Sequence, residues 1–289
     1  MRLVFLGTPE PAVTVLRAVA ARHEVVLVIT RPDRRRGRGG TFSASPVKLA
    51  ALELGLRVGH RLDELEGEEA QLGVVVAYGA MIPAAVLDRT PMLNVHFSLL
   101  PRWRGAAPVE RAILAGDLET GVSIMMLDTG LDTGPVYLER RVRIDEKSTA
   151  DLTHELADLG AQALLEVLAT PSLLANPRVQ EGEATYAQKL TAETFHVTPR
   201  VSRVEVLRTT RLGRAFTFVE GRRVLILEAR SDSARVDPGV VEVRDGRVLL
   251  GALDGALVLE RVQPEGSRPM NARDWWAGAR LEPGASRWA

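Results

Sequence analysis

The first half of the chain alternates short apolar runs with longer amphipathic segments, and this alternation most restricts the folds open to it. The apolar runs are residues 3–6, 25–29 and 74–77, and the amphipathic segments are residues 13–21, 46–54 and 83–87. Buried strands that alternate with helices are typical of a parallel sheet covered by helices. We therefore predict an N-terminal α/β domain with a Rossmann-like parallel sheet, closed by a helix over residues 150–168.

The pattern changes after about Arg200, where short apolar or alternating runs follow one another at close spacing. Glu220-Gly221, Asp245-Gly246 and Asp254-Gly255 separate these runs, and such pairs favour tight hairpins because glycine accepts a positive φ. We predict a C-terminal OB-like antiparallel β-barrel, a fold that often binds nucleic acid strands. The expected organisation is a catalytic domain over residues 1–178, a linker over 179–199 and the barrel domain over 200–289.

The charge of the chain is balanced overall but unevenly distributed. Its 37 Lys and Arg residues equal its 37 Asp and Glu residues, which argues against indiscriminate coating of nucleic acid. Arginines nevertheless crowd the Gly-rich segment 31–38 and a second region from Arg200 to Arg223. These clusters favour a polyanion bound at a defined place, and the alternative is solvated charge in an Arg-rich chain.

Several classes of protein are disfavoured by what the sequence lacks. The chain has no cysteine, and its five histidines have no metal-ligand spacing, so we expect no disulfide and no metal. No apolar run is long enough to span a bilayer and no signal-peptide pattern opens the chain, so we expect no membrane partner and a cytoplasmic location. Gly7-Thr8-Pro9 lacks the glycine spacing and the lysine of nucleotide-binding loops, which disfavours NAD and ATP.

Polar residues with catalytic chemistry follow a predicted buried strand that ends near residue 94. Asn94 and His96 are two residues apart, so both can project from one side of that strand. Asp132 lies in a turn between Gly130 and Gly134 and can orient an imidazole or stabilise its cation. An amide, an imidazole and a carboxylate at the carboxyl edge of a sheet form a candidate catalytic group.

These residues also carry a family signature. Asn94-Val95-His96, the segment Ser98, Leu99, Leu100, Pro101, and Leu131-Asp132-Thr133-Gly134 resemble the 10-formyltetrahydrofolate-dependent formyltransferases, and matching stretches run from Leu6 to Asp274. The resemblance implies that Asn94, His96 and Asp132 are catalytic and that 10-formyltetrahydrofolate is the co-substrate. It also implies that Ser98 to Pro101 border the folate pocket, which Tyr78 could share.

Within this family the chain most resembles the members that formylate methionyl initiator tRNA, and we expect a monomer with that tRNA as partner. The segment 30–40 resembles their tRNA-contacting insertion. The candidate tRNA-binding residues are Arg34, Arg36, Arg38, Arg200 and Arg203. Phe97 departs from the family, which usually has a small residue there, and is expected to reshape the wall beside His96.

Three other functions stay open at this point. The same folate chemistry could serve a small amine, such as an amino sugar nucleotide or glycinamide ribonucleotide. The scaffold could be a catalytically silent RNA-binding protein, although retention of Asn94, His96 and Asp132 argues against silence. A hydrolase that passes the formyl group to water would not need two basic clusters.

Overall fold

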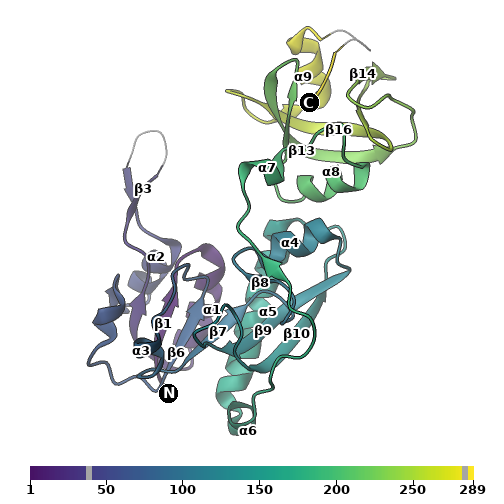
Figure 1. The fold of residues 1–289 in the computed structure, drawn as a ribbon. Coiled ribbons are helices and arrows are strands. Elements are labelled where there is room, and N and C mark those ends of the chain that lie inside the picture. The colour runs from purple at the N-terminus through teal and green to yellow at the C-terminus, as the bar shows by residue number, and fades with distance from the viewer. Residues whose placement is uncertain (37–40, 282–285) are drawn as a thin grey trace. The chain divides into compact units, whose positions relative to one another are not determined.

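The computed structural model describes residues 1–36, 41–281 and 286–289 (Figure 1). Contacts divide the chain into two compact units. The first comprises Met1–Val109, Leu118–Ile144 and Asp151–Gln188, and the second comprises Glu110–Asp117, Asp145–Ala150 and Lys189–Ala289. Residues 179–188, which the sequence analysis placed in a linker, therefore group with the first unit by their contacts.

The elements up to residue 187 include the alternating strands and helices that the sequence predicts, with further elements that it does not predict. They are β1 (Arg2–Gly7), α1 (Glu10–Ala20), β2 (Glu24–Ile29), β3 (Arg34–Arg36), β4 (Thr41–Ser43), α2 (Pro46–Glu53), β5 (Val58–Gly59), the 3-10 helix η1 (Leu62–Leu65), β6 (Leu72–Val76), α3 (Ala84–Leu87), β7 (Met92–His96), β8 (Arg104–Gly105), α4 (Pro108–Ala115), β9 (Glu119–Met126), β10 (Val136–Arg143), α5 (Thr149–Ala169), α6 (Pro171–Ala175) and β11 (Tyr186–Ala187).

The main sheet of the first unit has seven strands in the order β10-β9-β7-β6-β1-β2-β5. The strands from β7 to β5 pair in parallel, as predicted. β9 and β10 pair antiparallel at one edge, so the sheet is mixed rather than purely parallel. An antiparallel edge on an otherwise parallel sheet is common in α/β folds.

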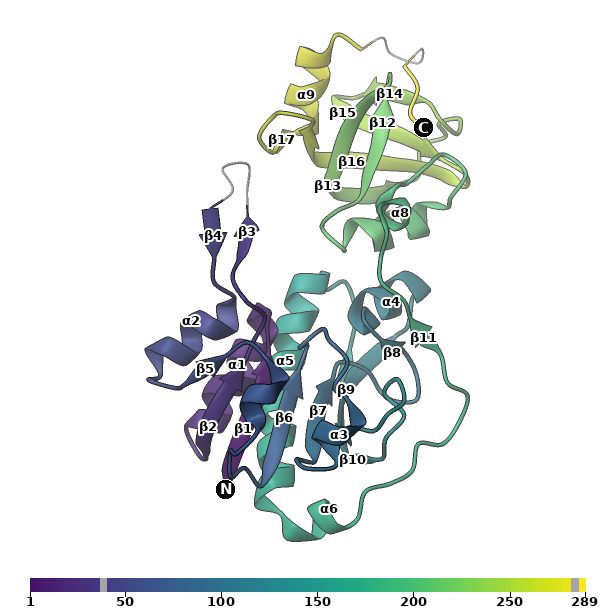
Figure 2. The ribbon, with the colours of Figure 1, turned by 60° about the vertical axis from the view of Figure 1, so that its left-hand side comes forward.

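Different elements cover the two faces of this sheet (Figure 2). Leu3, Phe5 and Val95 pack with residues of α1 and α5 on one face. Val4, Leu6 and their neighbours pack with η1 and α3 on the other. Because side chains alternate along a strand, β7 presents Leu93 and Val95 to the helical face and Asn94 and His96 to the opposite face.

The second unit is the antiparallel barrel that the turn signals predict. Its elements are α7 (Ala192–Phe195), α8 (Arg203–Thr210), β12 (Phe216–Val219), β13 (Arg222–Asp232), β14 (Val241–Arg244), β15 (Arg247–Ala252), β16 (Gly255–Pro264), β17 (Met270–Asn271) and α9 (Ala272–Ala279). The strand order is β12-β13-β16-β15-β14, with β17 beside β16. Glu220 and Asp245 each have a positive φ, of 47° and 52°, as the tight hairpin turns require.

The last four residues bridge the two edges of this sheet. Trp288 pairs with Val219 of β12, and Arg287 pairs with Val240 beside β14. The indole of Trp288 is 2% exposed and donates a hydrogen bond from Nε1 to the carbonyl oxygen of Gly251 at 2.9 Å. The tail thereby connects the edges of β12 and β14 and caps the apolar interior of the barrel. Among the helices described, none combines the length and hydropathy needed to cross a bilayer.

Candidate active site

β7 brings Asn94 and His96 together at the carboxyl end of a central strand. The strand lies between β6 and β9, and Asn94 pairs with Val75 on one side and Met125 on the other. The Phe97 ring packs into the helical core instead, and a Cβ on Gly160 of α5 would lie 3.7 Å from it. The expectation that Phe97 reshapes the wall beside His96 is therefore wrong, because strand alternation turns it to the other face.

The imidazole of His96 is 5% exposed and has a polar neighbour beside each ring nitrogen. Nε2 lies 2.9 Å from the carbonyl oxygen of Trp103. A carbonyl can only accept a hydrogen bond, so this contact places the proton of the neutral ring on Nε2. Nδ1 lies 3.6 Å from Oδ2 of Asp132 and is the nitrogen that can accept a further proton. Trp103 thus orients the ring, a role the sequence analysis gave to Asp132.

Asp132 is set in place by its backbone as well as by its carboxylate. Its φ of 52° lies in the left-handed region, which is uncommon for a residue with a side chain. Its Oδ2 accepts a hydrogen bond from the amide of Gly105 at 2.8 Å. Gly105 has a φ of 117°, and a Cβ there would lie 3.0 Å from the carbonyl oxygen of Ala187. Only glycine suits this position, which places a backbone donor against the carboxylate.

The Asn94 side chain is partly buried, and among the described residues none is hydrogen-bonded to its amide. An amide that does not bond to the protein can donate to an oxyanion that develops during a reaction. Asn94 therefore has the features of an oxyanion donor, beside a base at His96 and a carboxylate at Asp132. An oxyanion donor and a general base are groups that accelerate acyl transfer to an amine.

The segment from Ser98 to Pro101 forms a turn whose polar groups bond within the protein. Ser98 is fully buried, and its hydroxyl donates to the carbonyl oxygen of Arg102 at 2.6 Å. The Ser123 hydroxyl donates to the Ser98 carbonyl at 2.7 Å and accepts from the Leu100 amide at 3.2 Å. Leu100 packs into an apolar cluster, and the Leu100–Pro101 peptide is cis. Ser98 and Leu100 therefore shape this turn with their side chains.

Tyr78 lies in the loop after β6, on the same face of the sheet as Asn94 and His96. Its side chain is 6% exposed and packs in the apolar cluster of that face. Burial raises the pKa of its phenol, and the charge of Arg31 offsets part of this rise. The Thr8 hydroxyl donates to the Tyr78 carbonyl at 3.3 Å. Tyr78 is thus a neutral, buried wall of this region.

The arginine-rich segment is a hairpin with an anchored base. The hydroxyls of Thr30 and Ser45 lie 2.7 Å apart in a buried contact. Lys48 Nζ donates to both oxygens of Asp33, at 2.9 and 2.8 Å. Strands β3 and β4 pair above this base, and β3 carries the predicted residues Arg34 and Arg36. The third, Arg38, lies outside the described residues.

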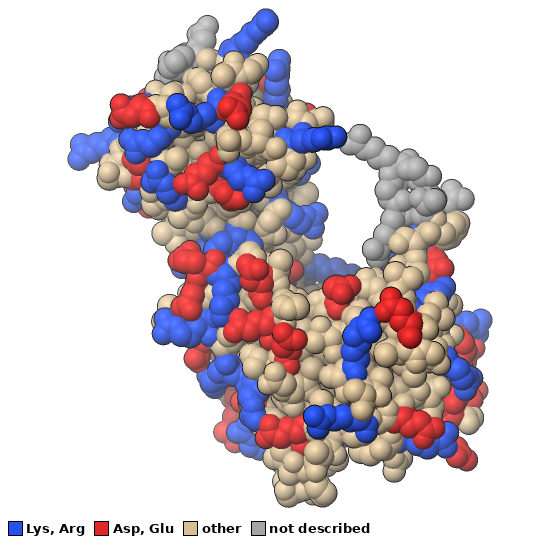
Figure 3. All heavy atoms as spheres, turned by 180° about the vertical axis from the view of Figure 1, so that it is seen from behind, with Lys and Arg blue, Asp and Glu red and all other residues tan. Residues whose placement is uncertain are grey.

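The two basic candidates of the second unit differ in their surroundings. Arg200 is exposed, whereas Arg203 is partly buried and donates from Nη1 to the carbonyl oxygen of Asp232 at 3.0 Å. Its Nε also lies 3.5 Å from Asp254. Figure 3 shows basic and acidic side chains interspersed on the face that it presents, in keeping with the neutral net charge. Arg203 has structural partners within its own unit, and Arg200 presents its charge to solvent.

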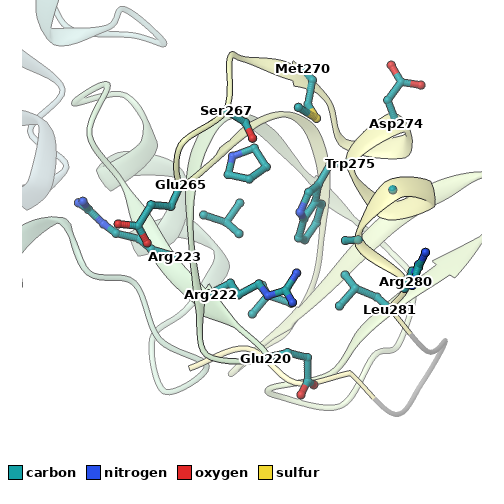
Figure 4. Close-up of a pocket in the computed structure, with 15 residues that line it drawn as sticks. Glu220, Arg222, Arg223, Glu265, Ser267, Met270, Asp274, Trp275, Arg280 and Leu281 are labelled. Atoms are coloured by element: carbon teal, nitrogen blue, oxygen red, sulfur yellow. The ribbon is translucent and has the colours of Figure 1, made fainter.

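A cavity of about 640 Å³ opens in the second unit between the β12–β13 turn, the end of β16 and α9. Trp275 faces its interior and the Arg222 side chain reaches across it, as Figure 4 shows. Trp275 is 6% exposed and belongs to the barrel core. None of the predicted site residues lines this cavity. The residues that the structure describes contain no cluster of His, Asp or Glu able to hold a metal ion.

Sequence analysis missed several groups that build the site. Trp103 contributes its carbonyl and Gly105 its amide, and both are backbone groups that residue type does not mark. Ser123 holds the Ser98 turn from the neighbouring strand β9. Gln180 donates to the carbonyl oxygens of Asp132 and Gly134. No local signal marks these residues, and the contacts of Gly105, Ser123 and Gln180 join segments that lie 25 or more residues apart.

Comparison with known proteins places this geometry in context. Residues 1–168 match the family model described as formyl transferase, and residues 206–280 match the formyl transferase C-terminal domain. The chain is 44% identical to the methionyl-tRNA formyltransferase of Thermus thermophilus, over 98% of each chain. It is 42% identical to that of a Jannaschia species, over 98% of this chain and 99% of the relative.

A solved structure supports the fold. The methionyl-tRNA formyltransferase from Clostridium thermocellum superposes with a TM-score of 0.57 at 17% identity, covering 81% of this chain and 95% of that one. At this identity the match concerns the architecture alone. The assignment to the formyl transferase family rests on the sequence relatives and on the family models.

Proposed function

Because this chain belongs to the formyl transferase family, we propose that it transfers the formyl group of 10-formyltetrahydrofolate to the α-amine of methionyl initiator tRNA, for the initiation of translation. The observation that most strongly supports this proposal is the 44% identity, over 98% of both chains, to an enzyme named for that reaction. The match includes the arginine-rich hairpin, whose residue type suits a polyanionic acceptor such as tRNA. This favours the tRNA over a small amine.

The site supplies the parts that the reaction needs. Asn94 donates its amide N–H to the oxygen of the formyl group as the acceptor nitrogen attacks, an effect worth about 10² to 10³ in rate. His96 takes the proton of that nitrogen on Nδ1, for about a further 10² to 10⁴. Asp132 stabilises the imidazolium from 3.6 Å. His96 then returns the proton to N10 as the bond from N10 to the formyl carbon breaks, and tetrahydrofolate leaves.

A moderate base is sufficient for this acceptor. A free α-amino group has a pKa of about 7.7 to 8.0, and esterification of the neighbouring carboxyl lowers it further. The amine of an aminoacyl ester is thus largely neutral near pH 7. His96 need only remove the proton that becomes acidic after attack, and no covalent enzyme intermediate is required.

The remaining candidate residues are assigned by position. The turn from Ser98 to Pro101 presents its backbone beside β7, and Tyr78 forms a neutral wall on the same face. We assign the folate to this region, held by backbone groups and by apolar contact with Leu99 and Tyr78. Since Ser98 and Leu100 are engaged inside the turn, we assign them the shaping of the pocket.

For the tRNA, we propose contacts from the hairpin residues Arg34, Arg36 and Arg38 and from Arg200. Guanidinium groups suit phosphates and unpaired nucleotide bases. The contacts of Thr30 with Ser45 and of Asp33 with Lys48 fix the position from which the hairpin extends. We assign Arg203 a structural role in the barrel, because it donates a hydrogen bond to the carbonyl oxygen of Asp232. We propose that the protein acts as a cytoplasmic monomer, in keeping with a substrate used in translation.

The first test supplies purified protein and 10-formyltetrahydrofolate with methionyl initiator tRNA, free methionine or no acceptor. Tetrahydrofolate release and acid-stable formylmethionyl product are followed in parallel. Turnover only with the charged tRNA is expected. Release without tRNA would move the acceptor to a small amine or water, and no turnover would favour a binding protein.

A further inference from the structure

Gln180 connects three segments of the first unit through its side-chain amide. Nε2 donates to the carbonyl oxygens of Asp132 and Gly134, at 2.8 and 2.7 Å. Oε1 accepts from Nη2 and Nε of Arg104, at 2.6 and 3.1 Å. Both amide protons and the carbonyl of a partly buried side chain are therefore engaged. A glutamine side chain has two N–H donors, and Gln180 uses both on the loop that contains Asp132 and Gly134.

The loop that Gln180 holds is the one that presents Asp132. Asp132 has a φ of 52°. This left-handed conformation is unfavourable for a residue that has a side chain, and it persists only where the surrounding structure holds it. The Gly105 amide fixes its carboxylate, and Gln180 fixes its carbonyl. Arg104, the neighbour of Gly105, holds Gln180 in turn. The contacts form a closed ring around the aspartate.

We propose that Gln180 is a positioning residue for formyl transfer, which sets the Asp132 carboxylate against Nδ1 of His96. The proposal rests on the proposed function and deepens it, since it names the group that holds the carboxylate in register. Gln180 touches neither His96 nor the reacting atoms. It acts through the backbone of Asp132, so its loss reduces the stabilisation of the imidazolium and leaves substrate binding in place.

The chemistry of the contacts requires an amide at this position. Two carbonyl oxygens need donors, and a guanidinium needs an acceptor. Glutamate has the same shape but sets carboxylate oxygens against the two carbonyls, while it still serves Arg104. Methionine keeps a similar volume and removes all four hydrogen bonds. The two substitutions therefore separate the Asp132 contacts from the Arg104 contacts.

The kinetic test compares Gln180→Met and Gln180→Glu with Glu181→Gln, a matched change at the exposed neighbouring residue. In single-turnover formylation of methionyl initiator tRNA, both Gln180 variants should lose about 10- to 100-fold in rate. In steady-state assays, their KM for tRNA and for folate should stay within about twofold of the wild type. The Glu181 variant should match the wild type. An unchanged rate, or a loss confined to KM, contradicts the proposal.

A double-mutant cycle separates positioning from general support of the fold. If Gln180 acts through Asp132, adding Gln180→Met to Asp132→Asn should cost less than about twofold beyond Asp132→Asn alone. Multiplicative losses would instead show that Gln180 serves another part of the site. A fall in Tm with an unchanged rate would reduce Gln180 to a structural residue.

An NMR measurement on the free protein needs no substrate. The ¹⁵N shifts of the His96 ring should change in Gln180→Met in the same direction as in Asp132→Asn, and should not change in Glu181→Gln. Unaltered His96 shifts in Gln180→Met would overturn the positioning role even if the protein formylates tRNA. Altered shifts would sustain the link from Gln180 to His96 even if the acceptor proved to be another amine.

Discussion

The carbonyl oxygen of Trp103 lies 2.9 Å from Nε2 of His96, and this contact fixes the tautomer of the neutral ring. Nε2 keeps its proton because the carbonyl can only accept. Nδ1 is then the base in the proposed mechanism, and it faces the carboxylate of Asp132 at 3.6 Å. The nitrogen that gains the proton is thus the one beside the negative charge, which stabilises the imidazolium where it forms.

Replacing His96 should remove proton transfer without removing the folate site. We expect His96→Ala to lower the single-turnover rate of formylation by about 10² to 10⁴. Folate affinity, measured by fluorescence titration, should stay within a few fold of the wild type. An unchanged rate would exclude His96 from the mechanism.

Replacing Asn94 should remove the proposed oxyanion donor. Asn94→Asp keeps the size of the side chain and removes its N–H donors, so we expect kcat to fall by about 10² to 10³ with little change in KM for tRNA. Steady-state kinetics with methionyl initiator tRNA measure both constants. A rise in KM at an unchanged kcat would assign Asn94 to substrate binding instead.

The ion pair between Asp33 and Lys48 should matter for tRNA and not for folate. Asp33→Asn weakens the anchor of the β3–β4 hairpin, and we expect KM for the charged tRNA to rise by about 2- to 5-fold. Glu53→Gln, which breaks the Arg17–Glu53 pair elsewhere in the same unit, is the control and should leave KM unchanged. An equal effect of Asp33→Asn on folate affinity would contradict this division.

Gly160 of α5 should be intolerant of a methyl group because it packs against the strand that carries the site. A Cβ there would lie 2.6 Å from Val95, so we expect Gly160→Ala to reduce the free energy of unfolding by about 1 to 2 kcal/mol, despite the better helix propensity of alanine. A Cβ on Gly278 of α9 meets no atom within 4 Å, and Gly278→Ala should be neutral or stabilising by up to about 1 kcal/mol. Urea denaturation checks both, and equal effects would exclude the packing argument.

Burial of Tyr78 should make the protein less stable at alkaline pH. Its pKa in the folded state is raised, so its contribution is complete below the ordinary tyrosine pKa of about 10 and is lost as the pH rises towards the folded value. Burial raises the pKa of Tyr137 in the same direction. The urea midpoint should therefore decline less between about pH 9 and 11 in Tyr78→Phe than in the wild type, and parallel curves would contradict this effect.

Much of the architecture follows from local pattern. The alternation of apolar runs predicts the parallel strands and the helix that forms α5, and the Glu220-Gly221 and Asp245-Gly246 pairs predict hairpins whose φ angles are positive. The two-residue spacing of Asn94 and His96 predicts that they share a face. The same alternation turns Phe97 away from them. The sequence analysis considered only the size of this residue and not the face of the sheet on which it lies.

The sequence by itself determined the periodicities, the turns and the types of side chain available for catalysis, because these depend on dihedral preferences and burial within a few residues. Only the tertiary structure decided that Trp103 sets the tautomer of His96, that Gln180 holds the loop of Asp132, and that Trp288 pairs with Val219 at the edge of the barrel. Each of these contacts joins a backbone group to a residue that another segment brings beside it. Every residue carries a backbone carbonyl and amide, so residue type cannot mark which of them will serve, and packing between distant segments makes that choice.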